Sequence, residues 1–241
     1  PCCIHEGDTP AFLPLVDNGL ASSLSPVYGG WGGRYVWRQP HGESRPFWTQ
    51  GGDSYPGRDS SRDTVSGADG QIYTTDQATI WRWRAAFQHD FAARMAWTVE
   101  PPERANHNPL VVVNGTPGTA PVLVTARIGQ AVVLDAAGTR DPDGHALRYR
   151  WWFYPEAGSG IPGAPVAVGR PPTEAPRSAA GSPPAALGVR PSPRVSIDGD
   201  MTPRAAVVPR VAGTAHVILE VTDDGTPSLT SYRRVILTIE P

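Results

Sequence analysis

Residues 109–241 consist of short apolar runs separated by turns, and this pattern constrains the fold more than any other feature of the chain. Two of the runs, AHVILEVTD and YRRVILTIE, alternate or stay apolar over the length of a strand. About seven such runs follow one another without a convincing helix, which predicts a β-sandwich. Residues 161–194 within this region are rich in Pro, Ala and Gly, and we expect them to form an extended insertion.

Residues 1–105 have a different character and contain the clearest helical pattern of the chain. The stretch DQATIWRWRAAFQHDFAARMAW spans residues 76–97, and Asp76 is its predicted N-cap. Large apolar side chains recur at every fourth position, namely Trp83, Phe87, Phe91 and Met95. This row predicts a buried helix face. Three polar residues beside it are either solvated or presented to a ligand: Arg82, Arg84 and His89.

A shorter helix is expected near the start of the chain. Asp8 or Thr9 can cap it, and Pro10 suits its first position. Gly19 is the expected left-handed residue after its end. The Pro pair at 101–102 follows the longer helix, and we place a domain boundary near residue 105.

Composition excludes several classes of function. The formal net charge of −2 and the pI of about 6.3 do not favour nucleic acid as a partner. The sequence contains no apolar run long enough for a transmembrane helix. Its two cysteines, Cys2 and Cys3, are neighbours, so they predict no internal disulfide framework. The chain begins with Pro1, and we expect a targeting segment to lie upstream.

The run Asp141-Pro142-Asp143-Gly144 has the pattern of a tight turn. Pro142 presets φ, and Gly144 permits a positive φ. A second interpretation makes Asp141, Asp143 and Asp223 ligands of Ca²⁺, because this cation prefers oxygen atoms. Both interpretations remain open at this stage.

Asn114-Gly115-Thr116 also has two interpretations. It is a glycosylation sequon, and it is an Asn-Gly turn between two strand-like runs. The flanking strand-like runs favour the turn.

Two further motifs lie in the first part of the chain. GGWGGRY (29–35) is either a sugar-stacking loop, with Trp31 as the platform and Arg34 as a donor, or a compact loop held by its aromatic residues. In HEGD, Asp8 is either a helix cap or a metal ligand, whereas Glu6 or His5 could transfer a proton.

The order of these motifs resembles a known family. EGDTPAFL is followed by GGWGGRY, IWRWRAAFQHDFAARMAWT, LDAAGTRDPDGHALRYRWWFYPEAG and HVILEVTDDGTPSLTSYRRVILTI. This series resembles the bacterial cellulose-binding proteins that join a nucleoside-hydrolase-like domain to a C-terminal immunoglobulin-like, PKD-like domain. The resemblance covers nearly all of the chain apart from the 161–194 insertion. It implies the C-terminal portion of an α/β domain over residues 1–105 and an all-β immunoglobulin-like sandwich over residues 106–241.

The same resemblance implies a function. The expected protein is extracellular or periplasmic, associates with polysaccharide, and hydrolyses glycosyl bonds with the help of Ca²⁺, which lowers the pKa of a bound water. Asp8 best matches the late loop that places an Asp on the metal. The implied catalytic groups are Glu6 and His5, and the candidate substrate-binding groups are Asn18, Trp31 and Arg34. Because no Asp-rich first loop precedes residue 5, this chain alone is expected to lack a complete active site. A non-catalytic carbohydrate-binding protein is the alternative, and a structural spacer is a third reading.

Overall fold

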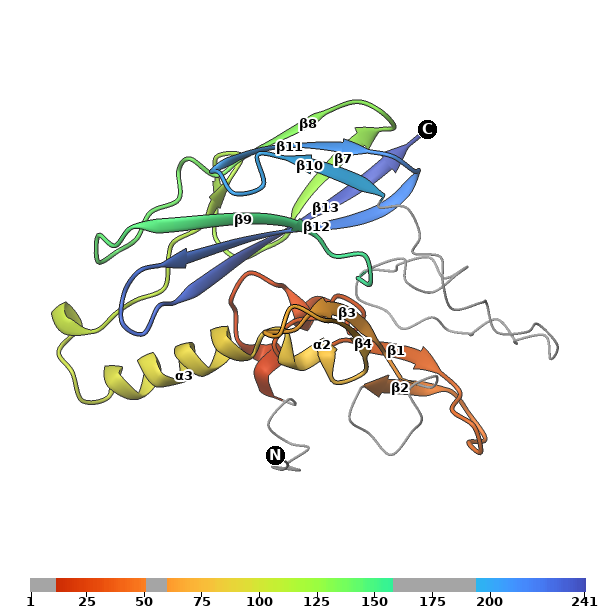
Figure 1. The fold of residues 1–241 in the computed structure, drawn as a ribbon, viewed down its shortest axis with the longest axis horizontal. Coiled ribbons are helices and arrows are strands. Elements are labelled where there is room, and N and C mark those ends of the chain that lie inside the picture. The colour runs from red at the N-terminus through yellow and green to blue at the C-terminus, as the bar shows by residue number, and fades with distance from the viewer. Residues whose placement is uncertain (1–11, 51–59, 158–193) are drawn as a thin grey trace.

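The computed structural model describes residues 12–50, 60–157 and 194–241. This part of the chain consists mostly of β-strands, with few helices. Figure 1 shows three layers: a three-stranded sheet, a four-stranded sheet, and an outer layer of helices and small hairpins beneath the second sheet. No helix among the described residues is both long and apolar enough to span a membrane.

The four-stranded sheet has the order β7-β13-β12-β9. Its strands are β7 (Val122–Arg127), β9 (Leu147–Phe153), β12 (Gly213–Asp223) and β13 (Thr230–Glu240). The long strands β12 and β13 form an antiparallel hairpin, β9 pairs antiparallel with β12, and β7 runs parallel to β13. These strands correspond to the apolar runs from which the sequence predicted a sheet.

The three-stranded sheet has the order β10-β11-β8 and packs on one face of the first sheet. Its strands are β8 (Val132–Asp135), β10 (Val195–Asp198) and β11 (Arg204–Pro209). The core between the sheets includes Trp151, which is 1% exposed, and its indole Nε1 donates to the Thr202 carbonyl oxygen at 3.0 Å. The two packed sheets that the sequence predicted are therefore present, with Trp151 between them.

The two faces of the four-stranded sheet carry alternate residues of each strand. On β12, Val217, Leu219 and Val221 belong to the core between the sheets, whereas Ile218 belongs to a second core beneath the sheet. The second core also contains aromatic residues from strands and outer layer alike: Trp31, Trp83, Tyr154 and Tyr232. The central sheet is thus covered on both faces.

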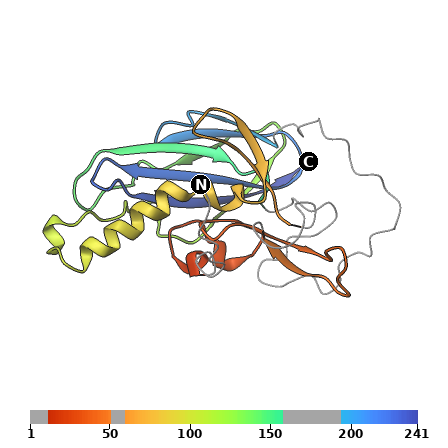
Figure 2. The same cartoon turned by 60° about the horizontal axis from the view of Figure 1, so that its bottom comes forward.

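The outer layer contains two hairpins and two helices, and Figure 2 shows α3 lying along the sheet. Its elements are β1 (Tyr35–Arg38), β2 (Phe47–Gln50), β3 (Asp63–Ser66), β4 (Ile72–Thr75), α2 (Ala78–Trp81) and α3 (Arg84–Trp97). Both hairpins are antiparallel. The α/β character predicted for this part of the chain therefore appears, in the described residues, only as two small hairpins beside α2 and α3.

The long helix departs from its prediction in three ways. It is interrupted at Arg82 and Trp83, so that α2 and α3 are separate. The amide of Ala78 is capped by the Thr75 hydroxyl at 3.0 Å, not by the Asp76 side chain. The predicted buried row is wrong in its second half, since Phe91 is 61% exposed, because only the start of α3 packs on the second core.

The segment before β1 is tied to the sheet by backbone contacts. Gly19 has φ +89°, as predicted for a left-handed residue, and a Cβ there would overlap the Tyr232 carbonyl oxygen. The helix expected near Asp8 falls largely outside the described residues, which begin with short 3-10 turns at Leu13–Leu15 and Ser22–Leu24. Another 3-10 turn, Pro102–Arg104, precedes the sheets.

Arg234 of β13 is the buried link between that segment and the sheet. Its guanidinium, 0% exposed, donates to three carbonyl oxygens of the segment and to His216 Nδ1 at 2.9 Å; the oxygens belong to Leu20, Tyr28 and Gly29. Burial lowers the pKa of Arg234 to about 10, so the side chain remains charged at neutral pH. Burial, and then the charge of Arg234, lower the pKa of His216 to about 2, so His216 is a neutral acceptor.

The predicted Asn-Gly turn is confirmed. Asn114 and Gly115 both have positive φ and connect β5 (Val112–Val113) to β6 (Thr116–Pro117). Two positive φ values in a two-residue loop match the twist of a hairpin. The predicted insertion at 161–194 lies outside the described residues except for Arg194.

Candidate functional site

A cleft of about 750 Å³ lies between the outer face of the four-stranded sheet and the outer layer. Its floor consists of alternate residues of β9, β12 and β13, namely Arg150, Trp152, Glu220, Thr222, Thr230 and Tyr232. Its walls come from β3, α2 and the start of α3, and include Thr64, Trp81, Arg82, Arg84 and His89. The cleft therefore depends on both the sheet and the outer layer.

Aromatic rings give the cleft planar apolar surfaces. Trp81 of α2 and Trp152 of β9 are both half-buried, so part of each ring faces solvent. The Arg82 guanidinium carbon lies 4.7 Å from the ring centre of Trp152 and 4.6 Å from that of Tyr154. Such stacking orients the guanidinium plane over the rings.

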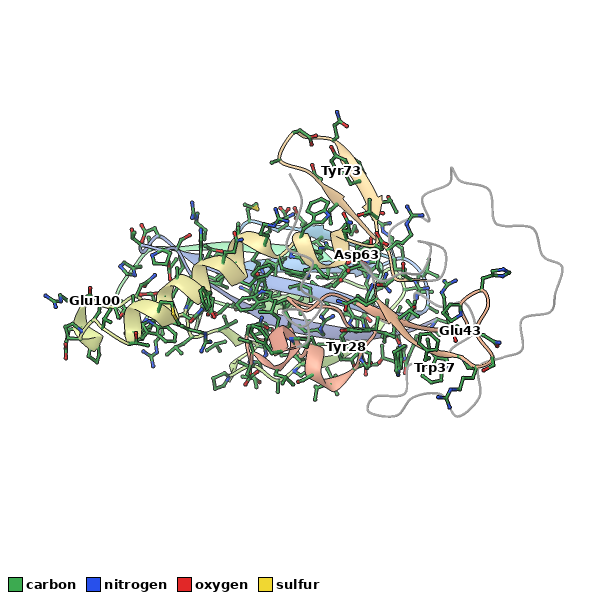
Figure 3. The ribbon with its side chains drawn as sticks, turned by 90° about the horizontal axis from the view of Figure 1, so that it is seen from below. Tyr28, Trp37, Glu43, Asp63, Tyr73 and Glu100 are labelled. Atoms are coloured by element: carbon green, nitrogen blue, oxygen red, sulfur yellow. The ribbon has the colours of Figure 1, made fainter. Side chains whose placement is uncertain are left out.

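A buried carboxylate fixes Arg82 in this position. Asp63, at the first position of β3, is 0% exposed, and Figure 3 shows it at the base of the hairpin that carries Tyr73. Its Oδ1 accepts from Arg34 Nε at 2.9 Å, and its Oδ2 accepts from Arg82 Nη1 at 2.9 Å. The Tyr154 hydroxyl also donates to Oδ2, at 2.6 Å.

The donors around Asp63 keep their protons. Burial, followed by the charge of Asp63, raises the pKa of Tyr154 far above its usual value, so the hydroxyl remains a donor. Arg34 uses its Nη2 on the Arg62 carbonyl oxygen at 2.8 Å. Asp63 therefore has a structural role: it holds the guanidinium of Arg82, which lines the cleft.

Two carboxyl groups near the cleft have raised pKa values. Burial raises the pKa of Glu220, although Arg150, whose Nη1 lies 4.0 Å from Glu220 Oε2, opposes the shift. Burial and then Asp63 raise the pKa of Glu156, which accepts a hydrogen bond from the Thr64 amide at 2.8 Å. Glu220 lines the cleft itself and is 27% exposed at its side chain. It can accept hydrogen bonds from a ligand in a partly desolvated setting.

The chemistry of the cleft suits a ligand rich in hydroxyl groups. Indole faces cover the apolar face of a flat ring, while guanidinium donors and a carboxylate acceptor bind hydroxyls at its edge. Trp81, Arg82 and Glu220 supply these three kinds of contact. His89 is less available, because its Nδ1 lies 3.0 Å from the Ser228 carbonyl oxygen.

The residues predicted to form the site are only partly described. His5, Glu6 and Asp8 lie outside the described residues, so their assignments remain predictions. Asn18 lines a separate pocket of about 310 Å³ together with residues that include Asp90, Arg94 and Arg140. Its Oδ1 accepts from the Leu20 amide at 3.0 Å, which shapes the turn at Gly19.

Burial corrects the predicted role of the GGWGGRY loop. Trp31 is 1% exposed and packs edge to face against Phe87 and Tyr232, so no sugar can stack on its ring. Arg34 is 5% exposed and its guanidinium contacts Asp63. Of the two interpretations left open by the sequence, the compact aromatic loop is the one that the structure has.

The structure also separates the three acidic residues considered as Ca²⁺ ligands. Asp223 is fully buried, and its Oδ1 accepts from the amides of Gly225 and Leu229, both at 2.9 Å. It shapes the turn between β12 and β13 and is not grouped with the other two. Asp141 and Asp143 do lie together, in the turn before β9.

Sequence reasoning missed the floor of the cleft. No motif of the sequence marks Arg150, Trp152, Glu220 or Asp63 as a binding residue. A signal exists in LRYRWWFY, where Arg148, Arg150 and Trp152 share one face of the strand. Polar residues on that face indicate a second, partly solvated surface opposite the core.

Comparison with known proteins connects this architecture to a family. Residues 131–239 match the model described as "Cellulose-binding protein Sde0182, C-terminal domain", and residues 2–35 match "Cellulose-binding Sde182, nucleoside hydrolase-like domain". No curated protein matches the chain at a significant level.

The solved structures that resemble the chain differ widely in their similarity to it. A nucleoside hydrolase-related hypothetical protein from Saccharophagus degradans, described as associated with carbohydrate metabolism, is 33% identical, with a TM-score of 0.63. The match covers 98% of this chain and 48% of that protein, so the chain spans about half the length of its relative. The PKD domain from KIAA 1837 protein is 16% identical over 50% of this chain and 83% of that domain, with a TM-score of 0.27.

The two matched models are the two domains of one family, and they occur in this chain in succession, over residues 2–35 and 131–239. The chain is therefore similar, in these two regions, to the cellulose-binding Sde182 proteins.

Proposed function

We propose that this protein binds polysaccharide outside the cytoplasm and that the cleft beneath the four-stranded sheet is its sugar-binding site. The observation that carries the proposal is the convergence of Trp81, Arg82 and Glu220 in one cleft of about 750 Å³. The match of residues 131–239 to a cellulose-binding protein's C-terminal domain favours a carbohydrate ligand and an extracellular or cell-surface location. The two packed sheets would be the immunoglobulin-like domain, which supplies the floor of the site.

Binding to insoluble cellulose tests this proposal. The Trp81→Ala variant loses one indole platform and is expected to bind roughly fivefold more weakly, which corresponds to about 1 kcal/mol of lost contact. Phe91→Ala is the matched control, because Phe91 is an exposed aromatic residue on α3 that does not line the cleft. Depletion from the supernatant across a range of cellulose concentrations gives both affinities. Equal binding by wild type and Trp81→Ala would place the sugar site elsewhere.

A second candidate function is hydrolysis of a glycosyl bond. It is favoured by the match of residues 2–35 to a nucleoside hydrolase-like domain, since that range contains His5, Glu6 and Asp8. In this proposal Asp8 is a ligand of Ca²⁺ and the other two residues transfer protons. The activity would belong to a longer protein, because this chain spans about half of its relative.

Metal-dependent release of sugar or base tests the hydrolase proposal separately. A protein that includes the upstream residues is incubated with nucleosides and short glucans, with Ca²⁺ or with a chelator. We expect release that stops with the chelator and with Asp8→Ala. No release from any substrate would reject catalysis while leaving the binding proposal intact.

A further inference from the structure

The turn between β8 and β9 brings three potential metal ligands together. Asp141, Asp143 and His145 alternate along the turn, and one ligand atom from each lies within 4.8 Å of the others. Gly144, with φ +83°, gives the backbone the curvature that this arrangement needs. The three side chains therefore point toward a common centre at one end of the two packed sheets.

Only one of the two carboxylate oxygens of Asp141 accepts hydrogen bonds among the described residues. Oδ1 accepts from the amides of Asp143 and His145, at 2.9 and 3.0 Å. The side chain is 1% exposed, yet Oδ2 has no hydrogen-bond partner among the described residues. A buried carboxylate oxygen without a partner is costly, so its presence indicates a ligand that compensates for it.

His145 also has a buried polar atom without a hydrogen-bond partner among the described residues. Its Nδ1 lies 3.5 Å from Asp141 Oδ1, is buried, and has no hydrogen-bond partner within the described part of the chain. Asp143 differs, because both of its carboxylate oxygens contact His107: Oδ2 accepts from the backbone amide at 2.7 Å, and Oδ1 lies 3.1 Å from Nδ1. Asp143 can turn one oxygen toward a cation while the other keeps the amide.

We propose that Asp141 Oδ2, Asp143 and His145 Nδ1 bind a divalent transition-metal cation of the Zn²⁺ type. Two carboxylate oxygens and one imidazole nitrogen suit such a cation, whereas Ca²⁺ is held by six to eight oxygen ligands in proteins. This choice of cation departs from the Ca²⁺ expected from the sequence, and His145 is the reason for it. Water completes the coordination on the exposed side.

The position of the site gives it a structural consequence. His107, which contacts Asp143, also stacks on Trp97 at the end of α3, with ring centres 5.7 Å apart and planes at 13°. A cation on Asp143 would therefore connect the turn before β9 with the segment that joins α3 to the sheets. The site is independent of the cleft and of the sugar-binding proposal.

Metal titration of the whole protein tests the site. Protein freed of metal with a chelator is titrated with Zn²⁺ by calorimetry, and with Co²⁺ by visible absorption. Since Cys2, Cys3 and His5 offer other ligands, the readout is the difference in stoichiometry between wild type and His145→Gln. We expect the variant to lose one equivalent of Zn²⁺. His41→Gln, which removes an exposed histidine in the turn between β1 and β2, should lose none.

A second variant tests the chemical reason for the choice of cation. His145→Asp makes the three ligands all oxygen, so the wild-type preference for Zn²⁺ over Ca²⁺ should reverse in this variant. Equal stoichiometry in wild type and His145→Gln would overturn the proposal. So would a wild-type turn that prefers Ca²⁺. Far-ultraviolet circular dichroism of each variant confirms that its strands are intact.

Discussion

The two faces of the four-stranded sheet come from the same strands but are held by different chemistry. The inner face, against the three-stranded sheet, presents mainly aliphatic residues such as Val217 and Leu237, with Trp151 at its centre. The outer face presents Arg234, His216 and Glu220 together with aromatic rings, and it forms the floor of the cleft. The inner face stabilises the fold by hydrophobic burial, which has no preferred direction. The outer face makes directional hydrogen bonds and ion pairs, and these determine the position of the outer layer.

The largest effect should come from breaking the inner face. Trp151→Ala removes the largest buried side chain of that core and leaves a cavity, so we expect the free energy of unfolding to fall by about 3–5 kcal/mol. Urea denaturation followed by far-ultraviolet circular dichroism measures the change. Leu123→Ala on β7 is the control, because Leu123 is 75% exposed and should change stability by no more than about 0.5 kcal/mol. A loss no larger than the control's would contradict the role assigned to Trp151.

Breaking the outer face should have a smaller and more local effect. Asp63→Asn keeps the shape of the side chain but leaves the guanidiniums of Arg34 and Arg82 buried without their carboxylate. The expected loss is about 3 kcal/mol, at the low end for a broken buried pair, because the amide oxygen still accepts one hydrogen bond. Hydrogen exchange should increase in β3, α2 and the cleft walls while β12 stays protected.

Asp69→Asn provides the control for that experiment. Asp69 lies in the exposed turn of the same hairpin. A hydrogen bond from the Tyr73 hydroxyl to its carboxylate lowers the pKa of Asp69. Replacing Asp69 by Asn should leave the rate of hydrogen exchange in α2 unchanged. Uniform acceleration over both sheets in Asp63→Asn would mean that the outer layer does not unfold separately, and that the two faces are not energetically distinct.

This comparison also explains which parts of the fold the sequence could predict. The inner face follows from local patterns: alternation in AHVILEVTD, the Asn-Gly turn at 114–115 and the Trp after LRYR are each visible within a few residues. Strand and turn chemistry act at short range, so such signals are readable without knowledge of tertiary contacts.

The outer face depends on partners that are far apart in the sequence. Asp63 meets Arg34 and Tyr154, 29 and 91 residues away, and no local pattern indicates these pairs. Trp31 looked equally suited to a sugar platform or a core, and only the neighbouring layers decide that it is buried. Phe91 shows the reverse case, because the helical period continues beyond the point where α3 leaves the core.

The smallest expected effect concerns the pH dependence of the outer face. His216 has a pKa of about 2 in the folded protein, mainly because it is buried and also because Arg234 is beside it. In the unfolded chain it would titrate near 6.5. Below pH 6.5 the unfolded state binds a proton that the folded state does not, so stability is complete above pH 6.5 and falls as the pH falls.

His216→Gln isolates this contribution. The slope from His216 approaches about 1.4 kcal/mol per pH unit, which amounts to a little over 2 kcal/mol between pH 6.5 and 4.5. Urea denaturation at several pH values should therefore give a shallower loss of stability in the variant than in wild type. Contributions from Glu156 and Glu220, whose raised pKa values act in the opposite direction, are present in both proteins and cancel in the comparison. Parallel pH profiles would show that His216 is solvated or protonated in the folded protein, and that the outer face lacks the neutral acceptor on which Arg234 depends.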